Sequence, residues 1–112
     1  RGTFAEFLKL GKYGQLSYFS ILPGKIRGGH YHHTKTEKFL LIEGSVKFNF
    51  KELYTGQKYS IKISEKNNKI ITTVPGWIHD IVNSSNKTAK LVVWANEVFS
   101  KKKPDTYSVS MK

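Results

Sequence analysis

The sequence predicts a single all-β domain, an antiparallel β-sandwich or β-barrel for which the jelly roll is the favoured arrangement. Three observations support this prediction. Apolar and polar residues alternate with a period of two, turn residues interrupt the chain at short intervals, and no segment shows the 3.6-residue period of an amphipathic helix. A chain of 112 residues fits one domain. It buries roughly two thirds of its unfolded surface, which is enough for a core.

The alternation is clearest in two segments, SVKFNFK at residues 45–51 and KYSIKIS at residues 58–64. Successive side chains of a strand point to opposite faces, so each segment predicts one apolar and one polar face. The apolar faces carry Val46, Phe48 and Phe50 in the first segment, and Tyr59, Ile61 and Ile63 in the second. Both segments are therefore predicted to be half-buried antiparallel strands.

The other strands are predicted from shorter apolar runs that lie between turn signals. They are expected at about residues 3–10, 15–22, 26–33, 37–43, 69–74, 78–83, 88–95 and 105–110. The turn signals between the runs are KYG, PG, EG, TG, EKNN, PG and NSSN. Short strands at this spacing are typical of sandwiches and barrels.

The composition excludes several classes of protein. The chain has no cysteine, which excludes disulfides, zinc–thiolate sites and thiol catalysis, so that any metal must bind nitrogen and oxygen. No apolar run approaches the roughly 20 residues of a membrane span, and the N-terminus lacks the order of a signal peptide. We therefore expect a cytoplasmic protein that does not associate with membranes. Because the chain begins at Arg1, we expect it to be part of a longer one.

The formal charge of +11 comes from lysines that are spread along the chain. Proteins that read bases or clamp phosphates rely on arginine, and this sequence has only Arg1 and Arg27. We therefore expect no nucleic-acid partner. Two explanations of the charge stay open: a solvated lysine-rich face, and attraction of a small anionic ligand such as a diphosphate.

Three of the four histidines lie within four residues, His30, His32 and His33, with Glu37 shortly after them. In a strand His30 and His32 face the same way, whereas Tyr31 and His33 face the other. Two imidazoles on one face can share an ion. Glu37 follows five residues after His32, far enough for the chain to turn and bring a carboxylate to the same point.

The fourth histidine, His79, lies in PGWIHDIVN, a later predicted strand that follows a proline–glycine turn. Three imidazole nitrogens and one carboxylate oxygen form a normal open site for zinc, iron, manganese, nickel or copper. The predicted metal ligands are His30, His32, Glu37 and His79. His33 is predicted to be a packing or surface residue. Gly28 and Gly29 are expected to let the backbone bend or approach closely beside the site.

This spacing resembles the two motifs of the cupin superfamily. The first, G-x5-H-x-H-x3/4-E-x6-G, is matched at Gly24, His30, His32, Glu37 and Gly44. The second, G-x5-P-x-G-x2-H-x3-N, is matched at Gly76, His79 and Asn83 and departs from the pattern at Asn68 and Val74. The resemblance implies a cupin-type antiparallel β-barrel or jelly roll. It does not fix the chemistry, because the superfamily includes dioxygenases, isomerases, decarboxylases, epimerases and storage proteins.

A narrower resemblance covers nearly the whole chain. The segments RGTFAEFLK, GQLSYFSILPGKIRGGHYHHTKTEKFLLIEG, WANEVF and PDTY are similar to the C-terminal cupin domain of bifunctional capsular polysaccharide enzymes that help to make UDP-N-acetyl-L-fucosamine. This resemblance implies zinc on the four ligands, a homodimer, and epimerisation at C3 of a UDP-4-keto-6-deoxy-N-acetylhexosamine. It also implies a short-chain reductase domain N-terminal to this segment. No G-x-G-x-x-G follows a strand here, so the nicotinamide-binding half lies outside this chain.

The catalytic base cannot be named from the sequence, and the candidates are Tyr31, Lys25 and Asp80. Asp80 adjoins His79 but points away from it by strand parity, which favours a surface role. Arg27 and Lys25 precede the histidine cluster and are candidates to bind the diphosphate. Solvated charges at a strand edge are an equal alternative for both.

Three functions remain open for such a site. The first is a metal-dependent sugar-nucleotide epimerase or isomerase, in which a metal polarises a ketone beside the proton that is removed. The second is a non-haem iron oxygenase with the same ligands, which iron content and oxygen consumption would identify. The third is a non-catalytic module that binds a sugar or holds a dimer together. The metal itself is expected to be zinc, with iron or manganese as alternatives.

Overall fold

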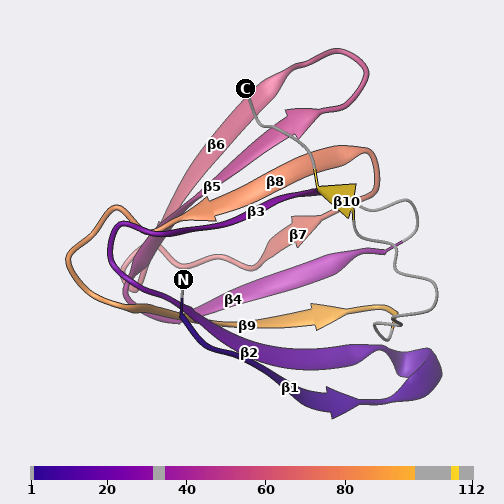
Figure 1. The fold of residues 1–112 in the computed structure, drawn as a ribbon, viewed down its shortest axis with the longest axis horizontal. Coiled ribbons are helices and arrows are strands. Elements are labelled where there is room, and N and C mark those ends of the chain that lie inside the picture. The colour runs from indigo at the N-terminus through magenta and orange to yellow at the C-terminus, as the bar shows by residue number, and fades with distance from the viewer. Residues whose placement is uncertain (1, 32–34, 98–106, 109–112) are drawn as a thin grey trace.

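The computed structural model describes residues 2–31, 35–97 and 107–108. These residues form ten β-strands in two five-stranded sheets that face each other (Figure 1). The first sheet has the order β1-β2-β9-β4-β7 and the second has the order β10-β3-β8-β5-β6. Every described pair of neighbouring strands is antiparallel. The predicted all-β, antiparallel fold is confirmed.

The strand boundaries follow the predicted ones closely. The first sheet contains β1 (Phe4–Lys9), β2 (Gln15–Ile21), β9 (Ala89–Ala95), β4 (Glu37–Glu43) and β7 (Ile71–Thr73). The second contains β10 (Tyr107–Ser108), β3 (Ile26–Tyr31), β8 (Trp77–Val82), β5 (Ser45–Glu52) and β6 (Lys58–Ser64). The outer parts of the predicted strands 26–33 and 105–110 fall outside the described residues. A short 3-10 helix, η1 (Gly11–Tyr13), occupies the predicted KYG turn.

The hydrophobic core lies between the two sheets. Phe39 of β4 stands at its centre, because its ring packs edge-on against Phe19 at 6.0 Å and against Phe48 at 5.3 Å between ring centroids. The largest apolar side chains that are fully buried are Phe48, Ile21, Ile63 and Leu91. Tyr59 lies on the predicted face, with its ring 6.3 Å from that of Phe50, but it is 59% exposed. It lies near the start of β6, the edge strand of its sheet, which pairs with β5 alone among the described strands.

Polarity changes along the barrel, as the strand register shows. Residues in register across the first sheet form one row after another, and the row at the end where β4 begins contains Gln15, Ala95, Glu37 and Thr73. The next row that faces the core contains Ser17, Val93, Phe39 and Ile71, and the third such row contains Phe19, Leu91 and Leu41. The polar end, where β9 ends and β8 begins, is called the barrel mouth below and lies at the right of Figure 1.

Asn83 holds the opposite end of the barrel together. It is fully buried, and its Nδ2 donates to the carbonyl oxygens of Ile21 at 2.8 Å and Lys87 at 2.7 Å. Its Oδ1 accepts from the backbone N–H of Ser85 at 3.0 Å and from the hydroxyl of Ser85 at 2.7 Å. The last residue of the second motif therefore joins the β8–β9 turn to β2.

Replacing Asn83 by alanine is expected to lower the free energy of unfolding by about 2–4 kcal/mol, because the buried carbonyl of Ile21 loses its side-chain donor and the β8–β9 turn loses its hydrogen bonds to Asn83. Urea unfolding followed by circular dichroism measures this change. Asn86→Ala is the control, since Asn86 lies exposed in the same turn and should change stability by no more than about 0.5 kcal/mol. Equal losses in both variants would contradict the structural role of Asn83.

Within the described part of the chain, no helix is long and apolar enough to cross a membrane.

Candidate metal centre at the barrel mouth

Two of the four predicted ligands, Glu37 and His79, meet at the barrel mouth from opposite sheets. Glu37 is the first residue of β4, and His79 lies in β8. Their Oε1 and Nε2 atoms are 3.7 Å apart, and their side chains are only 16% and 6% exposed. Two donors bound to the same zinc ion at about 2.1 Å each lie at most about 4.2 Å apart. The pair therefore fits a shared divalent ion.

Neighbouring residues fix the position of Glu37. The hydroxyl of Thr73 donates to Oε1 of Glu37 at 3.4 Å from the adjacent strand β7. One residue earlier, the backbone N–H of Thr36 donates to Oδ1 of Asn96 at 2.9 Å, and the backbone N–H of Asn96 donates to the carbonyl of Thr36 at 3.1 Å. These contacts hold both the carboxylate and the start of its strand.

The surroundings of His79 are apolar. The ring of Phe39 packs edge-on against its imidazole at 5.9 Å, and the backbone of Phe50 lies directly opposite in β5. His79 as a whole is 5% exposed. Packing on this scale limits the rotamers of the imidazole, as a metal ligand requires.

The remaining predicted ligands are described only in part. The backbone of His30 pairs with that of His79 between β3 and β8, which brings the histidine segment beside this strand. The side chains of His30 and Tyr31 and the whole of His32 and His33 lie outside the described residues. Among the side chains that the structure describes, no three histidine, cysteine or acidic residues form a metal-binding group. The four-ligand centre stays a prediction.

Gly28 allows β3 to run close to His79. Its φ is +130°, and a Cβ atom there would lie 2.4 Å from Cα of Asp80 and 2.6 Å from the carbonyl oxygen of His79. The register between β3 and β8 also shifts between Gly28 and His30. No side chain fits this contact, so the expected close approach of the backbone is confirmed at Gly28.

Asp80 lies on the outer face of the second sheet, as strand parity predicts. Its Oδ1 accepts a hydrogen bond of 2.7 Å from Nδ2 of Asn49, whose Oδ1 accepts one of 2.7 Å from the hydroxyl of Ser60. The three residues link β8, β5 and β6 on the face opposite to His79. The structure does not bring this catalytic candidate to Glu37 and His79.

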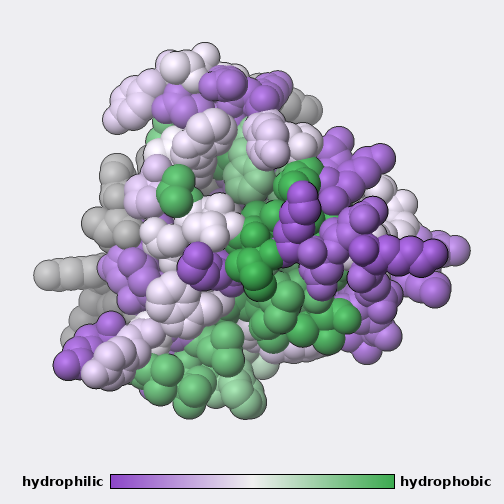
Figure 2. Space-filling view, turned by 180° about the vertical axis from the view of Figure 1, so that it is seen from behind, coloured by the Kyte–Doolittle hydropathy of each residue, from purple (hydrophilic) through white to green (hydrophobic). Residues whose placement is uncertain are grey.

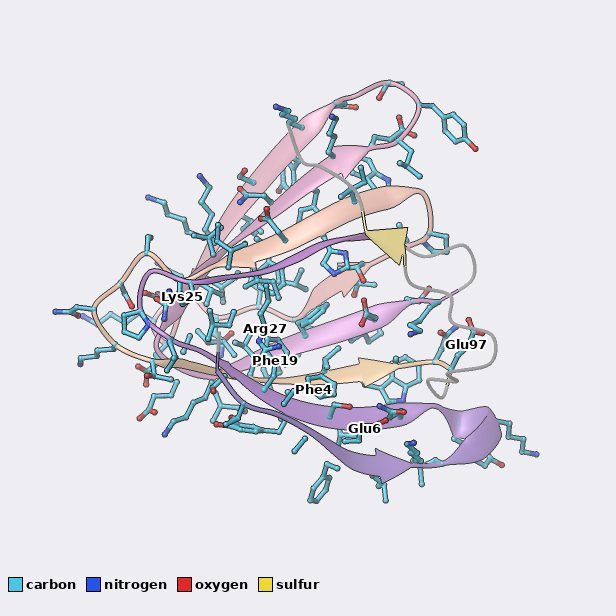
Figure 3. All side chains as sticks on the ribbon, in the orientation of Figure 1. Phe4, Glu6, Phe19, Lys25, Arg27 and Glu97 are labelled. Carbon is cyan, nitrogen blue, oxygen red and sulfur yellow. The ribbon has the colours of Figure 1, made fainter. Side chains whose placement is uncertain are left out.

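Arg27 and Lys25 also lie away from the pair. The guanidinium of Arg27 donates to the carbonyl oxygens of Ser20 at 3.1 Å and Thr3 at 3.0 Å, and it stacks 5.5 Å above the ring centre of Phe19 (Figure 3). Arg27 thus ties β3 to β2 and to the start of the chain. Lys25 is exposed in the turn before β3, about 16 Å along an extended strand from His30.

Several residues at the mouth were not predicted from the sequence. Thr73 contacts Glu37, while Gln15 is buried and its Nε2 donates to the hydroxyl of Ser17 at 3.0 Å. Lys35, two residues before Glu37, is only 7% exposed. Polar residues in strands usually face solvent, so the sequence does not indicate that Thr73 and Gln15 lie at a candidate site. Strand parity could have placed Lys35 on the same face as Glu37, because the two residues are two positions apart.

A hollow of about 200 Å³ opens among residues that neighbour Glu37 and His79, although neither of the two lines it. It is lined by Phe50, Tyr59, Thr72, Thr73, Val74 and Trp77. Two of the lining residues neighbour the pair, because Thr73 donates to Glu37 and Phe50 lies opposite His79.

Comparisons with known proteins agree with this architecture. Residues 1–107 match the family described as the polysaccharide biosynthesis C-terminal domain. A Pseudomonas aeruginosa protein named UDP-2-acetamido-2,6-beta-L-arabino-hexul-4-ose reductase is 50% identical over 111 residues, which are 99% of this chain and 30% of that protein. The chain thus spans about a third of the length of this relative.

Solved structures are similar over almost the whole chain. The capsular polysaccharide assembling protein CapF from Staphylococcus aureus is 33% identical with a TM-score of 0.93, over 98% of this chain and 30% of CapF. A dTDP sugar isomerase from Desulfovibrio desulfuricans shares the fold at 10% identity and a TM-score of 0.81, over 93% of this chain and 69% of the isomerase. The predicted resemblance to the cupin domain of capsular polysaccharide enzymes is confirmed.

Proposed function

Because the chain belongs to the polysaccharide biosynthesis C-terminal domain family, we propose that it is a metal-dependent domain that epimerises C3 of a UDP-4-keto-6-deoxy-N-acetylhexosamine. The observation that carries the proposal is the 3.7 Å contact between Glu37 and His79 at the barrel mouth. The name of the Pseudomonas aeruginosa relative supports the substrate class, since a hexul-4-ose carries a ketone at C4. That ketone makes the neighbouring C3 hydrogen acidic.

The reaction needs no oxidant or reductant. The C3–H bond breaks and the proton leaves to a base, while the electron pair of that bond is delocalised towards the C4 oxygen as an enolate. A proton then returns to C3 on the other face. When bound by Glu37 and His79 with His30 and His32, a divalent metal, zinc in preference to iron or manganese, supplies Lewis-acid stabilisation of negative charge.

The chain's own residues prepare the site for this chemistry. Thr73 orients the carboxylate of Glu37, and Phe39 holds the imidazole of His79. The apolar rows beneath the mouth exclude water from below, which strengthens the interaction between fixed charges and a developing oxyanion. The base stays unassigned, because Lys25 and Asp80 lie away from the pair and the side chain of Tyr31 is not described.

The name of the relative describes a reductase, and this chain covers 30% of that protein. Hydride transfer needs a nicotinamide cofactor, whose G-x-G-x-x-G fingerprint this sequence lacks. We therefore propose that a cytoplasmic, nicotinamide-dependent reductase domain precedes this segment and acts on the same UDP-sugar. Mass spectrometry of the protein isolated from its host would test this, and an intact mass equal to that of this chain alone would contradict it.

We also propose that the chain forms a homodimer. The edge strand β1 is exposed throughout and carries Phe4, Phe7 and Leu8, which are 55%, 72% and 43% exposed. Figure 2 shows that apolar side chains also gather on the face turned away in Figure 1. An exposed apolar edge strand is a template for pairing with another chain, and contiguous exposed apolar patches mark interaction sites. Sedimentation velocity should show a dimer, and a monomer at all concentrations would contradict it.

The epimerase proposal is tested by proton exchange at C3. The chain is incubated in D₂O with a UDP-4-keto-6-deoxy-N-acetylhexosamine, and the C3 proton is followed by NMR. The proposal predicts loss of the C3 signal with no oxygen consumption. A C3 signal that persists in a metal-replete sample would contradict it, and oxygen consumption would instead identify the oxygenase alternative.

A further inference from the structure

We propose that the hollow beside Glu37 and His79 binds the 6-deoxyhexose ring of the sugar nucleotide, with the aromatic side chains of Trp77 and Tyr59 against its apolar face. This inference rests on the proposed function and adds a substrate-binding site to it. Neither Tyr59 nor Trp77 occupies a specified position of the two sequence motifs, and neither residue belongs to the predicted ligand set.

The hollow is separated from the Glu37–His79 pair only by its own lining residues. Two of its lining residues contact the predicted ligands directly, since Thr73 donates to Glu37 and the backbone of Phe50 lies opposite that of His79. A carbon atom that reacts beside Glu37 and His79 therefore has its own ring within reach of the hollow.

The hollow has room for a single sugar ring. Its volume of about 200 Å³ lies below the roughly 300–1,000 Å³ of pockets that enclose drug-sized ligands. A complete sugar nucleotide is too large. The nucleobase is also excluded as the occupant, because a diphosphate separates it from the reacting sugar and the hollow adjoins the reaction centre.

The lining favours the apolar face of a 6-deoxy sugar. Phe50 forms a buried floor, and its ring lies 6.3 Å from that of Tyr59, tilted by 33°. Tyr59 is 59% exposed and Val74 is 45% exposed, so both sides of the hollow keep apolar surface that a ligand would cover. A C6 methyl group gains from this contact, whereas a C6 hydroxyl group would lose hydration there.

The two tryptophans of the chain allow a direct test. Trp94 donates from Nε1 to the carbonyl of Tyr13 at 3.1 Å, away from the hollow, so Trp94→Phe leaves Trp77 as the single fluorophore. This variant is titrated with a UDP-2-acetamido-2,6-dideoxyhexose, which lacks the ketone and cannot react. We expect its emission to shift with this ligand and to stay unchanged with UDP alone. The Trp77→Phe variant, which reports on Trp94, should show no shift with either ligand.

A kinetic measurement separates this inference from the proposed function. In the C3 exchange assay, Trp77→Ala should raise KM about tenfold and leave kcat within about threefold, as expected for loss of uniform binding. Trp77→Phe should recover most of the affinity. A fluorescence shift without C3 exchange would overturn the epimerase proposal but not the sugar site. An equal shift with UDP alone, or an unchanged KM for Trp77→Ala, would overturn the sugar site.

Discussion

Replacing Glu37 by glutamine is expected to lower the rate of C3 proton exchange by at least about 100-fold while the chain stays folded. Glutamine has almost the same shape and can still accept the hydrogen bond from Thr73, so packing at the mouth is preserved. The change removes the only carboxylate of the predicted ligand set. The exchange rate is measured by NMR, and bound metal is measured by inductively coupled plasma mass spectrometry on the same sample.

The matched control is Glu43→Gln, at the other end of the same strand. Glu43 is exposed and its Oε2 lies 2.9 Å from Nζ of Lys90, whose hydrogen bond holds the pKa of this carboxyl below its usual value. Exchange and bound metal should both be unchanged in this variant, because an exposed ion pair contributes little. A Glu37→Gln chain that retains its metal and exchanges at the original rate would exclude Glu37 from the centre.

Replacing Gly28 by alanine is expected to have the largest effect on stability, a loss of about 3 kcal/mol or more. The added Cβ would lie 2.4 Å from Cα of Asp80, and the φ of +130° is strained for any residue but glycine. The two strands can separate only by moving the backbone of His79, so bound metal should fall as well. Thermal and urea unfolding measure the loss of stability.

Gly24→Ala separates backbone strain from this steric conflict. Gly24 has a φ of +75°, but nothing lies within 4 Å of the Cβ it would gain. This variant should lose only about 1–2 kcal/mol, the cost of a left-handed conformation, and should keep its metal. If Gly28→Ala and Gly24→Ala lower the free energy of unfolding equally, the close contact between Gly28 and Asp80 does not contribute to the loss.

The strands could be predicted because a strand with one buried face shows alternating apolar and polar residues. In the 45–51 segment, Phe48 and Phe50 face the core as predicted, and parity also placed Asp80 away from His79. The same rule gave the face of Tyr59 but not its exposure, since parity does not give the distance of a residue from the edge of the sheet. Position in the sheet depends on strand order, which a period of two does not contain.

The site could be predicted only where the residue types and their spacing form a recognisable pattern. Glu37 and His79 were identified because, with His30 and His32, they complete a three-nitrogen, one-oxygen metal-ligand set, and the structure brings these two together. Arg27 shows the limit of this reasoning. Its position just before the histidines suggested a phosphate ligand, but its hydrogen bonds go to the backbone of Thr3 and Ser20. Thr73 could not be identified, because its contact with Glu37 depends on the pairing of β4 with β7.

The most direct test of the metal-dependent epimerase is the rate of C3 exchange measured against the metal bound per chain. The chain is stripped with a chelator, dialysed, and reloaded with increasing zinc, iron or manganese before each NMR measurement in D₂O. The account predicts no exchange without metal, and a rate that rises in proportion to the bound ion until each chain holds one. Exchange at an unchanged rate in the metal-free chain would contradict it.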